Sequence, residues 1–235
     1  MNTRSNPHLA AFTLIEGLFV VCILAVLIAI LLPALARPRR GVHRWDCSNN
    51  LKATSLAFKQ WALDNNDKFP MQVSVTNGGT MELIEQGIVY ADFLVMSNEL
   101  NTPKVLICPE ESDRNRRMAH TWGETGLTGN AGQILIPFAN NHNTSYFVGV
   151  DAEDTKPGML FVGDACFSIA KKPVAPGLHK LWPGTEVGWT KPIRERHGKG
   201  GHIGLTDGSV TACDARLFQL VLRQSGDFTN RVAVP

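Results

Sequence analysis

The N-terminal part of the chain is a long run of apolar residues. From Phe12 to Ala36 the only charged residue is Glu16, and residues 17–36 carry no charge. A helix of about 20 residues, at about 1.5 Å per residue, spans the roughly 30 Å hydrocarbon thickness of a bilayer. The pattern therefore predicts a transmembrane helix at residues 12–36.

Beyond Ala36 the pattern changes to that of an amphipathic helix, which continues to about Asp64. Pro33 and Pro38 are expected to bend it, because each removes a backbone donor. Its apolar residues fall on one arc of a 3.6-residue period, which predicts a stripe that packs on a globular head. The stripe contains Cys47, Leu51, Phe58, Trp61 and Ala62.

Two leucines of the same helix, Leu56 and Leu63, point away from this stripe. Isolated surface leucines are common in soluble proteins and are one interpretation. A contact between the stems of neighbouring subunits in a filament is the other, and the sequence leaves both open.

The C-terminal part of the chain carries strand and turn signals. Residues 146–150 alternate, a turn-rich stretch follows, and residues 159–167 form a second apolar run, which together predict a hairpin with a long loop. Asp207-Gly208 is a turn pair preferred where both positions need positive φ. It predicts a second hairpin that pairs Leu205 with Val210.

The same register pairs Ile203 with Ala212 and leaves Cys213 on the other face together with His202. Asp214 can cap a helix from Ala215 to about Ser225, which Gly226 would end. The predicted fold class is α+β, with a long N-terminal membrane-to-stem helix packed on a small antiparallel β-sheet head.

Composition and charge narrow the function classes. The 235 residues are 44% hydrophobic and 19% charged, which fits one folded domain with an additional segment. Lys and Arg number 23 against 21 Asp and Glu, which leaves a net charge of +2. Since nucleic-acid-binding proteins usually concentrate basic charge on one face, we expect no nucleic-acid partner.

Three interpretations compete for the N-terminal segment. A cleaved secretory signal has an apolar core of about 7–15 residues, shorter than this run. An ordinary anchor would not carry Glu16, since an unpaired ionisable group in a membrane costs several kcal/mol. The third interpretation is a cut between Ala11 and Phe12, after which a neighbouring subunit's Phe12 amine pairs with Glu16. Before such pairing, we expect the Glu16 carboxyl either to be protonated, with a raised pKa, or to lie near the membrane interface.

The third interpretation is supported by the motif Ala11-Phe12-Thr13-Leu14-Ile15-Glu16, which resembles the prepilin processing motif of type IV pilins and type II secretion pseudopilins. That family usually has Gly in place of Ala11. The resemblance implies that a prepilin peptidase cuts before Phe12 and methylates the new amine, and that Glu16 sets the register between subunits. The implied domains are a leader peptide (1–11), a transmembrane and assembly helix (12–36), an amphipathic stem helix (37–65) and a globular α+β head (66–235).

Further segments extend this resemblance over most of the chain. Residues 47–70, CSNNLKATSLAFKQWALDNNDKFP, look like the stem end of a pseudopilin-like group. Members of that group also carry a His, nine residues and Asp-Gly near the C-terminal end, which here are His197 and Asp207-Gly208. Residues 97–111 and 145–164 are similar to the same group.

The resemblance implies a non-enzymatic structural subunit of a type II secretion pseudopilus or a type IV pilus-like filament. The implied partners are a prepilin peptidase, sibling pilin or pseudopilin subunits, and an assembly ATPase with its inner-membrane platform. The implied location is a single pass through the inner membrane with the head in the periplasm, and in the filament after assembly. The positive-inside rule opposes this topology, because four arginines follow the apolar run: Arg37, Arg39, Arg40 and Arg44.

His197, His202 and Asp207 are candidates for a metal or catalytic site, since imidazole and carboxylate groups bind zinc or relay protons. Asp207 is already explained by its turn, which favours a structural role. The alternative function is a membrane-tethered extracytoplasmic binding protein or enzyme with a site around His197, His202 and Asp164. A methylated Phe12 as mature N-terminus would favour assembly over this alternative.

Calcium is a further candidate ligand, because some major pseudopilins bind it in their heads. Oxygen ligands for this ion could come from Asp151, Glu153, Asp154 and Asp164. Their spacing matches no calcium loop, so a solvated acidic turn is the favoured interpretation and no cofactor is expected.

The five cysteines contain no Cys-x-x-Cys pair, which argues against a zinc ribbon or a thioredoxin-like site. Cys22 lies in the apolar run as a small filler. A head outside the cytoplasm would permit disulfides. Cys47 with Cys108 is the favoured pair, and Cys166 with Cys213 is the second candidate.

Overall fold

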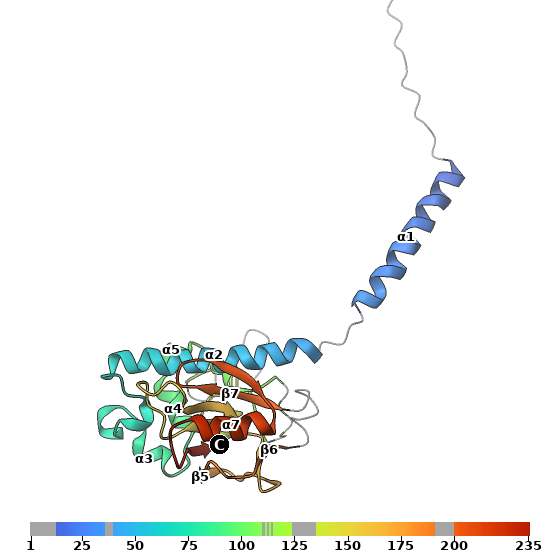
Figure 1. The fold of residues 1–235 in the computed structure, drawn as a ribbon. Coiled ribbons are helices and arrows are strands. Elements are labelled where there is room, and N and C mark those ends of the chain that lie inside the picture. Colours follow the sequence, from blue (N-terminus) through green and yellow to red (C-terminus); the bar gives the residue numbers. More distant parts are fainter. Residues whose placement is uncertain are drawn as a thin grey trace, which may run out of the picture. The chain divides into compact units, whose positions relative to one another are not determined.

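The computed structural model describes residues 13–35, 40–109, 111, 113, 115–123, 135–190 and 200–235. Within these ranges the side chains are described for every residue except 31–35 and 40–44. The chain divides into two compact units, Met1–Arg39 and Arg40–Pro235 (Figure 1). The predicted leader at 1–11, Phe12 and His197 lie outside the described residues.

The N-terminal unit contains the helix α1 (Leu14–Leu35). The helix begins with a capping box, in which Glu16 Oε2 accepts a hydrogen bond from the Thr13 N–H at 2.8 Å and the Thr13 hydroxyl accepts the Glu16 N–H at 3.4 Å. All large apolar side chains described in α1, from Leu14 to Ile30, are exposed. Apolar surface therefore covers all sides of this helix.

The expectation of a membrane-spanning helix is wrong. Among the described residues, no helix combines the length and the apolar character required to cross a bilayer. This finding contradicts the transmembrane helix at 12–36, the membrane-to-stem helix of the predicted fold, and the single-pass inner-membrane location with a periplasmic head.

The second unit begins with α2 (Arg40–Asp64), which packs on the strands β2, β7 and β8 of the main sheet. The predicted stripe is confirmed, since Cys47, Leu51, Phe58, Trp61 and Ala62 are all buried. Leu56 and Leu63 are exposed, with 57% and 77% of their surface accessible. The amphipathic pattern thus fixes which face of α2 meets the sheet.

Short helices connect α2 to the sheet and cover one end of the core. Proline opens two of them, and side-chain caps from Ser74, Thr102 and Asn140 begin three. They are η1 (Pro70–Gln72), η2 (Val75–Asn77), α3 (Met81–Ile84), α4 (Tyr90–Val95), α5 (Ser97–Leu100), η3 (Pro103–Leu106) and η4 (Asn141–Asn143).

The strands form two antiparallel sheets. The main sheet has six strands in the order β5-β9-β1-β2-β7-β8, and the smaller one has three in the order β4-β3-β6. The bounds are β1 (Tyr146–Gly149), β2 (Leu160–Asp164), β3 (Phe167–Ile169), β4 (Lys172–Pro173), β5 (Gly177–Lys180), β6 (Val187–Trp189), β7 (Gly201–Leu205), β8 (Val210–Cys213) and β9 (Arg231–Val234). The predicted hairpin of residues 146–150 and 159–167 is confirmed by the pairing of β1 with β2.

The predicted second hairpin exists, but its register is wrong. Val210 pairs with Gly204 instead of Leu205, and Ala212 pairs with His202. Only Gly208 of the turn pair has a positive φ, +85°, so the loop is a three-residue turn with one extra residue on one strand. Cys213 therefore lies opposite Gly201, on the face away from His202.

The C-terminal helix α7 (Ala215–Gln224) is confirmed, with the Asp214 side chain accepting the N–H of Leu217. After Gly226 the chain returns as β9, a strand that the sequence pattern did not indicate. β9 inserts between β5 and β1 and is buried over three of its four residues. A segment that is distant in sequence thereby joins the edge strand β5 to β1.

The main sheet separates two hydrophobic cores. One lies between α2, the short helices and the sheet, around Phe58, Phe69 and Phe161. The other lies around Phe167 and Phe218, where α7 and the smaller sheet cover the opposite side (Figure 1). The head is thus α+β with a sheet covered on both faces, rather than a small sheet against a single helix.

Candidate functional site

The predicted assembly residues lie at the start of α1. Ala11 and Phe12 are outside the described residues, whereas Glu16 is described in the first turn of the helix. Its exposed carboxylate accepts hydrogen bonds from both the backbone N–H and the hydroxyl of Thr13, each at 2.8 Å. These bonds lower the pKa of Glu16.

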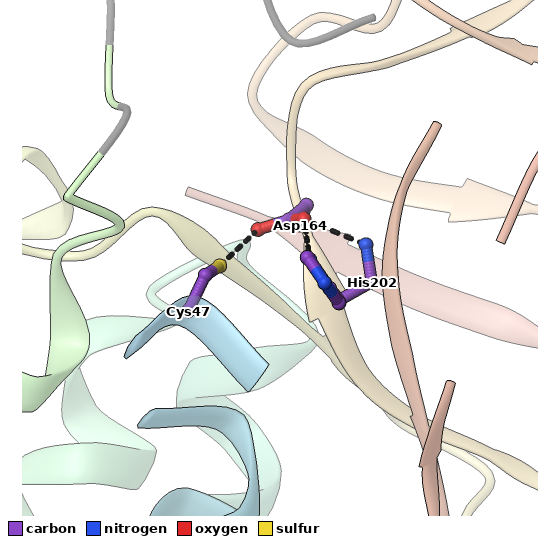
Figure 2. Close-up of side chains that lie close together, drawn as sticks. All are labelled: Cys47, Asp164 and His202. Carbon is purple, nitrogen blue, oxygen red and sulfur yellow. Dashed lines mark hydrogen bonds and ion pairs between the residues drawn. The ribbon is translucent and has the colours of Figure 1, made fainter. Parts of the chain in front are cut away.

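A second candidate site lies between α2 and the main sheet, where Cys47, Asp164 and His202 meet (Figure 2). Cys47 belongs to the buried stripe of α2, and Asp164 is the last residue of β2. The register pairs Gly163 of β2 with Ile203 of β7, which places His202 beside Asp164. Three segments that are far apart in sequence therefore supply the three side chains.

The Asp164 carboxylate lies between the other two groups and presents one oxygen to each (Figure 2). The Cys47 thiol donates to Oδ1 over 3.3 Å. Oδ2 accepts the backbone N–H of His202 at 2.7 Å, and the Nδ1 atom of His202 lies 3.4 Å from the same oxygen. Cys47, Asp164 and His202 are 0%, 0% and 2% exposed.

Two further groups border this cluster. The Tyr146 hydroxyl lies 3.7 Å from the Cys47 sulfur, because β1 pairs Tyr146 directly with Asp164. A hydrogen bond with the Cys108 thiol is the largest cause of the raised pKa of Cys47, followed by burial and by the charge of Asp164. Burial is the main cause of the raised pKa of Tyr146. The Cys47 thiol and the Tyr146 hydroxyl are therefore protonated at neutral pH.

Comparisons with protein-family models, curated proteins and solved structures found no match to this chain. The resemblance to pilins and pseudopilins therefore rests on the sequence motifs and stays a prediction.

The chemistry available to the cluster follows from its burial. A thiol acts as a nucleophile through its thiolate, and a raised pKa removes that form at neutral pH. A substrate in solvent would also have no direct access to side chains with 2% or less of their surface exposed. The cluster does contain the thiol, carboxylate and imidazole donors of metal sites, with one ligand atom of each within 4.8 Å of the others.

The structure separates the residues that the sequence grouped. His202 and Asp164 of the alternative site come together, whereas His197 is outside the described residues. The Asp207 carboxylate accepts the N–H of Ser209 within its own turn and is exposed. Sequence reasoning missed Cys47 as the third member, although its position on the inward stripe of α2 was the available signal.

The four acids considered for calcium have separate partners. Asp151 binds Arg231, Glu153 binds Lys156 at 2.8 Å, and Asp154 binds Lys59 at 2.7 Å. Asp164 is buried in the cluster with Cys47 and His202. The described structure therefore does not bring these four carboxylates together around one position.

The cysteine pairs are placed differently. Cys47 and Cys108 are buried neighbours, and all five cysteines are thiols in this structure. The Cys166 thiol lies 3.9 Å from Glu111, whereas the Cys213 thiol donates to the Asp214 carbonyl at 3.2 Å. Only the first pair shares one environment, and its disulfide stays a prediction.

A surface cavity of about 630 Å³ lies near the edge of the main sheet, with Arg116, Cys166 and Val174 in its lining. The Arg116 guanidinium donates to the carbonyl oxygens of Thr144 and Pro235 and pairs with Glu111 at 3.4 Å. Its cation is thus engaged by the chain itself, which makes the cavity a weaker candidate than the buried cluster.

Proposed function

We propose that the chain is a structural subunit of a type II secretion pseudopilus or a type IV pilus-like filament, which assembles with sibling subunits through α1. The observation that carries the proposal is the surface of this helix. Every large apolar side chain described in α1 is exposed, on all sides of the helix.

A helix that is apolar all round is stable when other chain segments bury it. Burial contributes about 25 cal/mol per Å² of apolar surface, so association of such helices is strongly favourable. An identical helix of a second copy offers the same apolar length and the same single acidic residue. We therefore take the α1 helices of neighbouring subunits as the occupants of this surface.

Apolar packing alone would not fix how far one α1 helix is shifted along its neighbour, and an ion pair at Glu16 would fix that shift. Both hydrogen bonds from Thr13 end on Oε2, and within the described residues no hydrogen bond to Oε1 is present. Cleavage before Phe12 by a prepilin peptidase would create an amine that can pair with Oε1 of a neighbouring subunit. An assembly ATPase would then be the partner that drives subunit addition.

The natural cysteine Cys22 gives a direct test, because it is exposed on α1. Mild oxidation of the full chain should produce covalent dimers linked through Cys22, and Cys22→Ser should abolish them. Leu27→Arg, which places a charge on the apolar surface of α1, should reduce dimer formation at least tenfold. The matched control is Val75→Arg, a charge at an exposed apolar residue of the head.

Dimers that form equally well with Leu27→Arg, or that form through cysteines other than Cys22, would contradict assembly through α1. A chain that stays monomeric at all concentrations would contradict the subunit proposal as a whole. N-terminal sequencing of the native protein tests the processing step separately, since cleavage before Phe12 exposes that residue.

A further inference from the structure

We propose that Cys47, Asp164 and His202, together with Cys108, bind a structural zinc ion that fastens α2 to the main sheet. The site is independent of the α1 surface on which the assembly proposal rests. It would serve the stability of the head and not catalysis.

The first support is the geometry of the three side chains in Figure 2. With Zn–S near 2.3 Å and Zn–N or Zn–O near 2.0–2.1 Å, the ligand atoms of a tetrahedral site lie about 3.3–3.8 Å apart. The sulfur of Cys47 lies 3.3 Å from Asp164 Oδ1, and Nδ1 of His202 lies 3.4 Å from the other oxygen, Oδ2, so the carboxylate has to turn to offer one oxygen to an ion between them. Among Cys47, Asp164 and His202 the widest separation between ligand atoms is no more than 4.8 Å, so binding requires these three ligands to close by about 1 Å.

The second support is a fourth ligand. Cys108 follows η3 and is 2% exposed, and its backbone N–H donates to Ser145 Oγ at 3.1 Å next to β1. This bond fixes the segment beside Cys47, whose thiol is close enough to hydrogen-bond with the Cys108 thiol. Cys108 is not one of the three residues whose ligand atoms lie within 4.8 Å of one another, so its thiol would have to move towards them to complete the closed four-ligand set of a structural zinc site.

The third support is the chemistry around the ligands. Metal ligands are usually oriented by further hydrogen bonds. Here the backbone N–H of His202 donates a hydrogen bond to Asp164 Oδ2. The Tyr146 hydroxyl lies 3.7 Å from the Cys47 sulfur and can donate to a thiolate there. Binding would release the two thiol protons to solvent, and the zinc charge would offset the buried carboxylate and thiolates.

Zinc is favoured over other cations by this donor set. Thiolate ligands select soft or borderline ions, whereas calcium and magnesium require oxygen ligands. With only one carboxylate in the group, the site offers calcium too few oxygens. A Cys47–Cys108 disulfide would use the same two sulfurs and therefore excludes the zinc site.

The test uses the full chain, purified with reductant and mixed with equimolar zinc, followed by gel filtration and elemental analysis. We expect one zinc per chain. With cobalt in place of zinc, we expect visible bands of a tetrahedral ion and an intense thiolate-to-cobalt band. These two measurements need no substitution and so do not depend on how variants fold.

Variants then locate the site. Cys47→Ser and His202→Gln should each lose stoichiometric zinc and the cobalt bands, with folding checked by far-UV circular dichroism. The matched control is Cys213→Ser, which alters a buried cysteine outside the group and should keep one zinc per chain.

Three results would overturn the proposal. The folded, reduced chain could bind no zinc, its cobalt spectrum could lack the thiolate band, or Cys213→Ser could lose as much metal as Cys47→Ser. A further measurement is peptide mapping of the native protein without reductant. A disulfide between Cys47 and Cys108 in that map would contradict zinc binding, because the same two sulfurs would no longer be available as ligands.

Discussion

Asp92 is a carboxylate enclosed by the first hydrophobic core, with none of its surface exposed. The Thr80 hydroxyl donates to Oδ1, while Oδ2 is buried without a hydrogen-bond partner in the described part of the chain. Burial raises the pKa of Asp92 to about 7. The folded state therefore retains a proton on Asp92 that the unfolded chain, with a pKa of about 3.9, has already released.

This difference makes the stability of the head depend on pH. Because the pKa of Asp92 is raised in the folded state, the stability of the head is highest below a pH of about 4, where the carboxyl is protonated in both states. This stability is lost as the pH rises to about 7, since the unfolded chain releases the proton first. The loss amounts to about 2–4 kcal/mol in the free energy of unfolding. Asp92→Asn should remove this decline, as measured by urea unfolding between pH 4 and 8.

Asp207→Asn is the matched control for that experiment, because Asp207 is an exposed carboxylate in a turn. Its pH profile should run parallel to that of the unchanged chain. A parallel profile for Asp92→Asn as well would show that the buried carboxyl does not titrate between the two states.

Glu16 combines a local and an intermolecular role that two substitutions can separate. Glu16→Gln keeps the side-chain oxygen that caps Thr13 N–H but removes the charge, since Gln also completes a capping box. Glu16→Ala removes both. If Glu16 registers subunits through its charge, both variants should reduce crosslinking through Cys22 severalfold. Crosslinking that falls only in Glu16→Ala would assign the effect to the helix cap.

At the scale of elements, the amphipathic pattern of α2 determines which of its side chains are buried in the core. Leu51 is completely buried, whereas Leu56 is 57% exposed on the same helix. Leu51→Ala should lower the free energy of unfolding by about 2–5 kcal/mol, because it removes buried methyl groups and leaves a cavity. Leu56→Ala should change it by less than about 0.5 kcal/mol, as measured by urea unfolding. Equal effects would mean that α2 packs through a different face.

The β7–β8 turn depends on one backbone conformation. Gly208 has a φ of +85°, and a Cβ there would meet only the Lys59 side chain at 3.8 Å, an ordinary contact. Gly208→Ala should therefore cost about 1–2 kcal/mol through backbone strain alone. Gly184→Ala is the control, because Gly184 lies in open space without a positive φ. An equal cost at both positions in urea unfolding would contradict this conformation.

At the scale of the whole molecule, the head and α1 separate as two units. The residues of both hydrophobic cores lie between Cys47 and Val234, within the unit Arg40–Pro235. A chain that begins at Arg40 should therefore keep the melting temperature of the head within about 2 °C and lose self-association. A lower melting temperature would show that Met1–Arg39 contributes to the core, and continued self-association would place the contact on the head.

Local patterns were sufficient for the elements whose hydrogen bonds are close in sequence. The buried stripe of α2, the β1–β2 pairing, and α7 with its Asp214 cap were all predictable, because periodicity and capping act over a few residues. The position of the turn at Gly208 was predictable, but the residue pairing of β7 with β8 was not. One extra residue in the turn shifts every pair of residues along the two strands.

Only the tertiary structure decided the features that depend on distant segments. β9 was missed because its pairing with β1 and β5 depends on residues about 50–85 positions away in sequence, beyond any local signal. Cys47, Asp164 and His202 meet for the same reason, through the register of β2 with β7 and the packing of α2. The sequence by itself determined the apolar helix, the inward face of α2 and the motif around Glu16, whereas the long-range contacts of the fold determined the second core and the buried cluster.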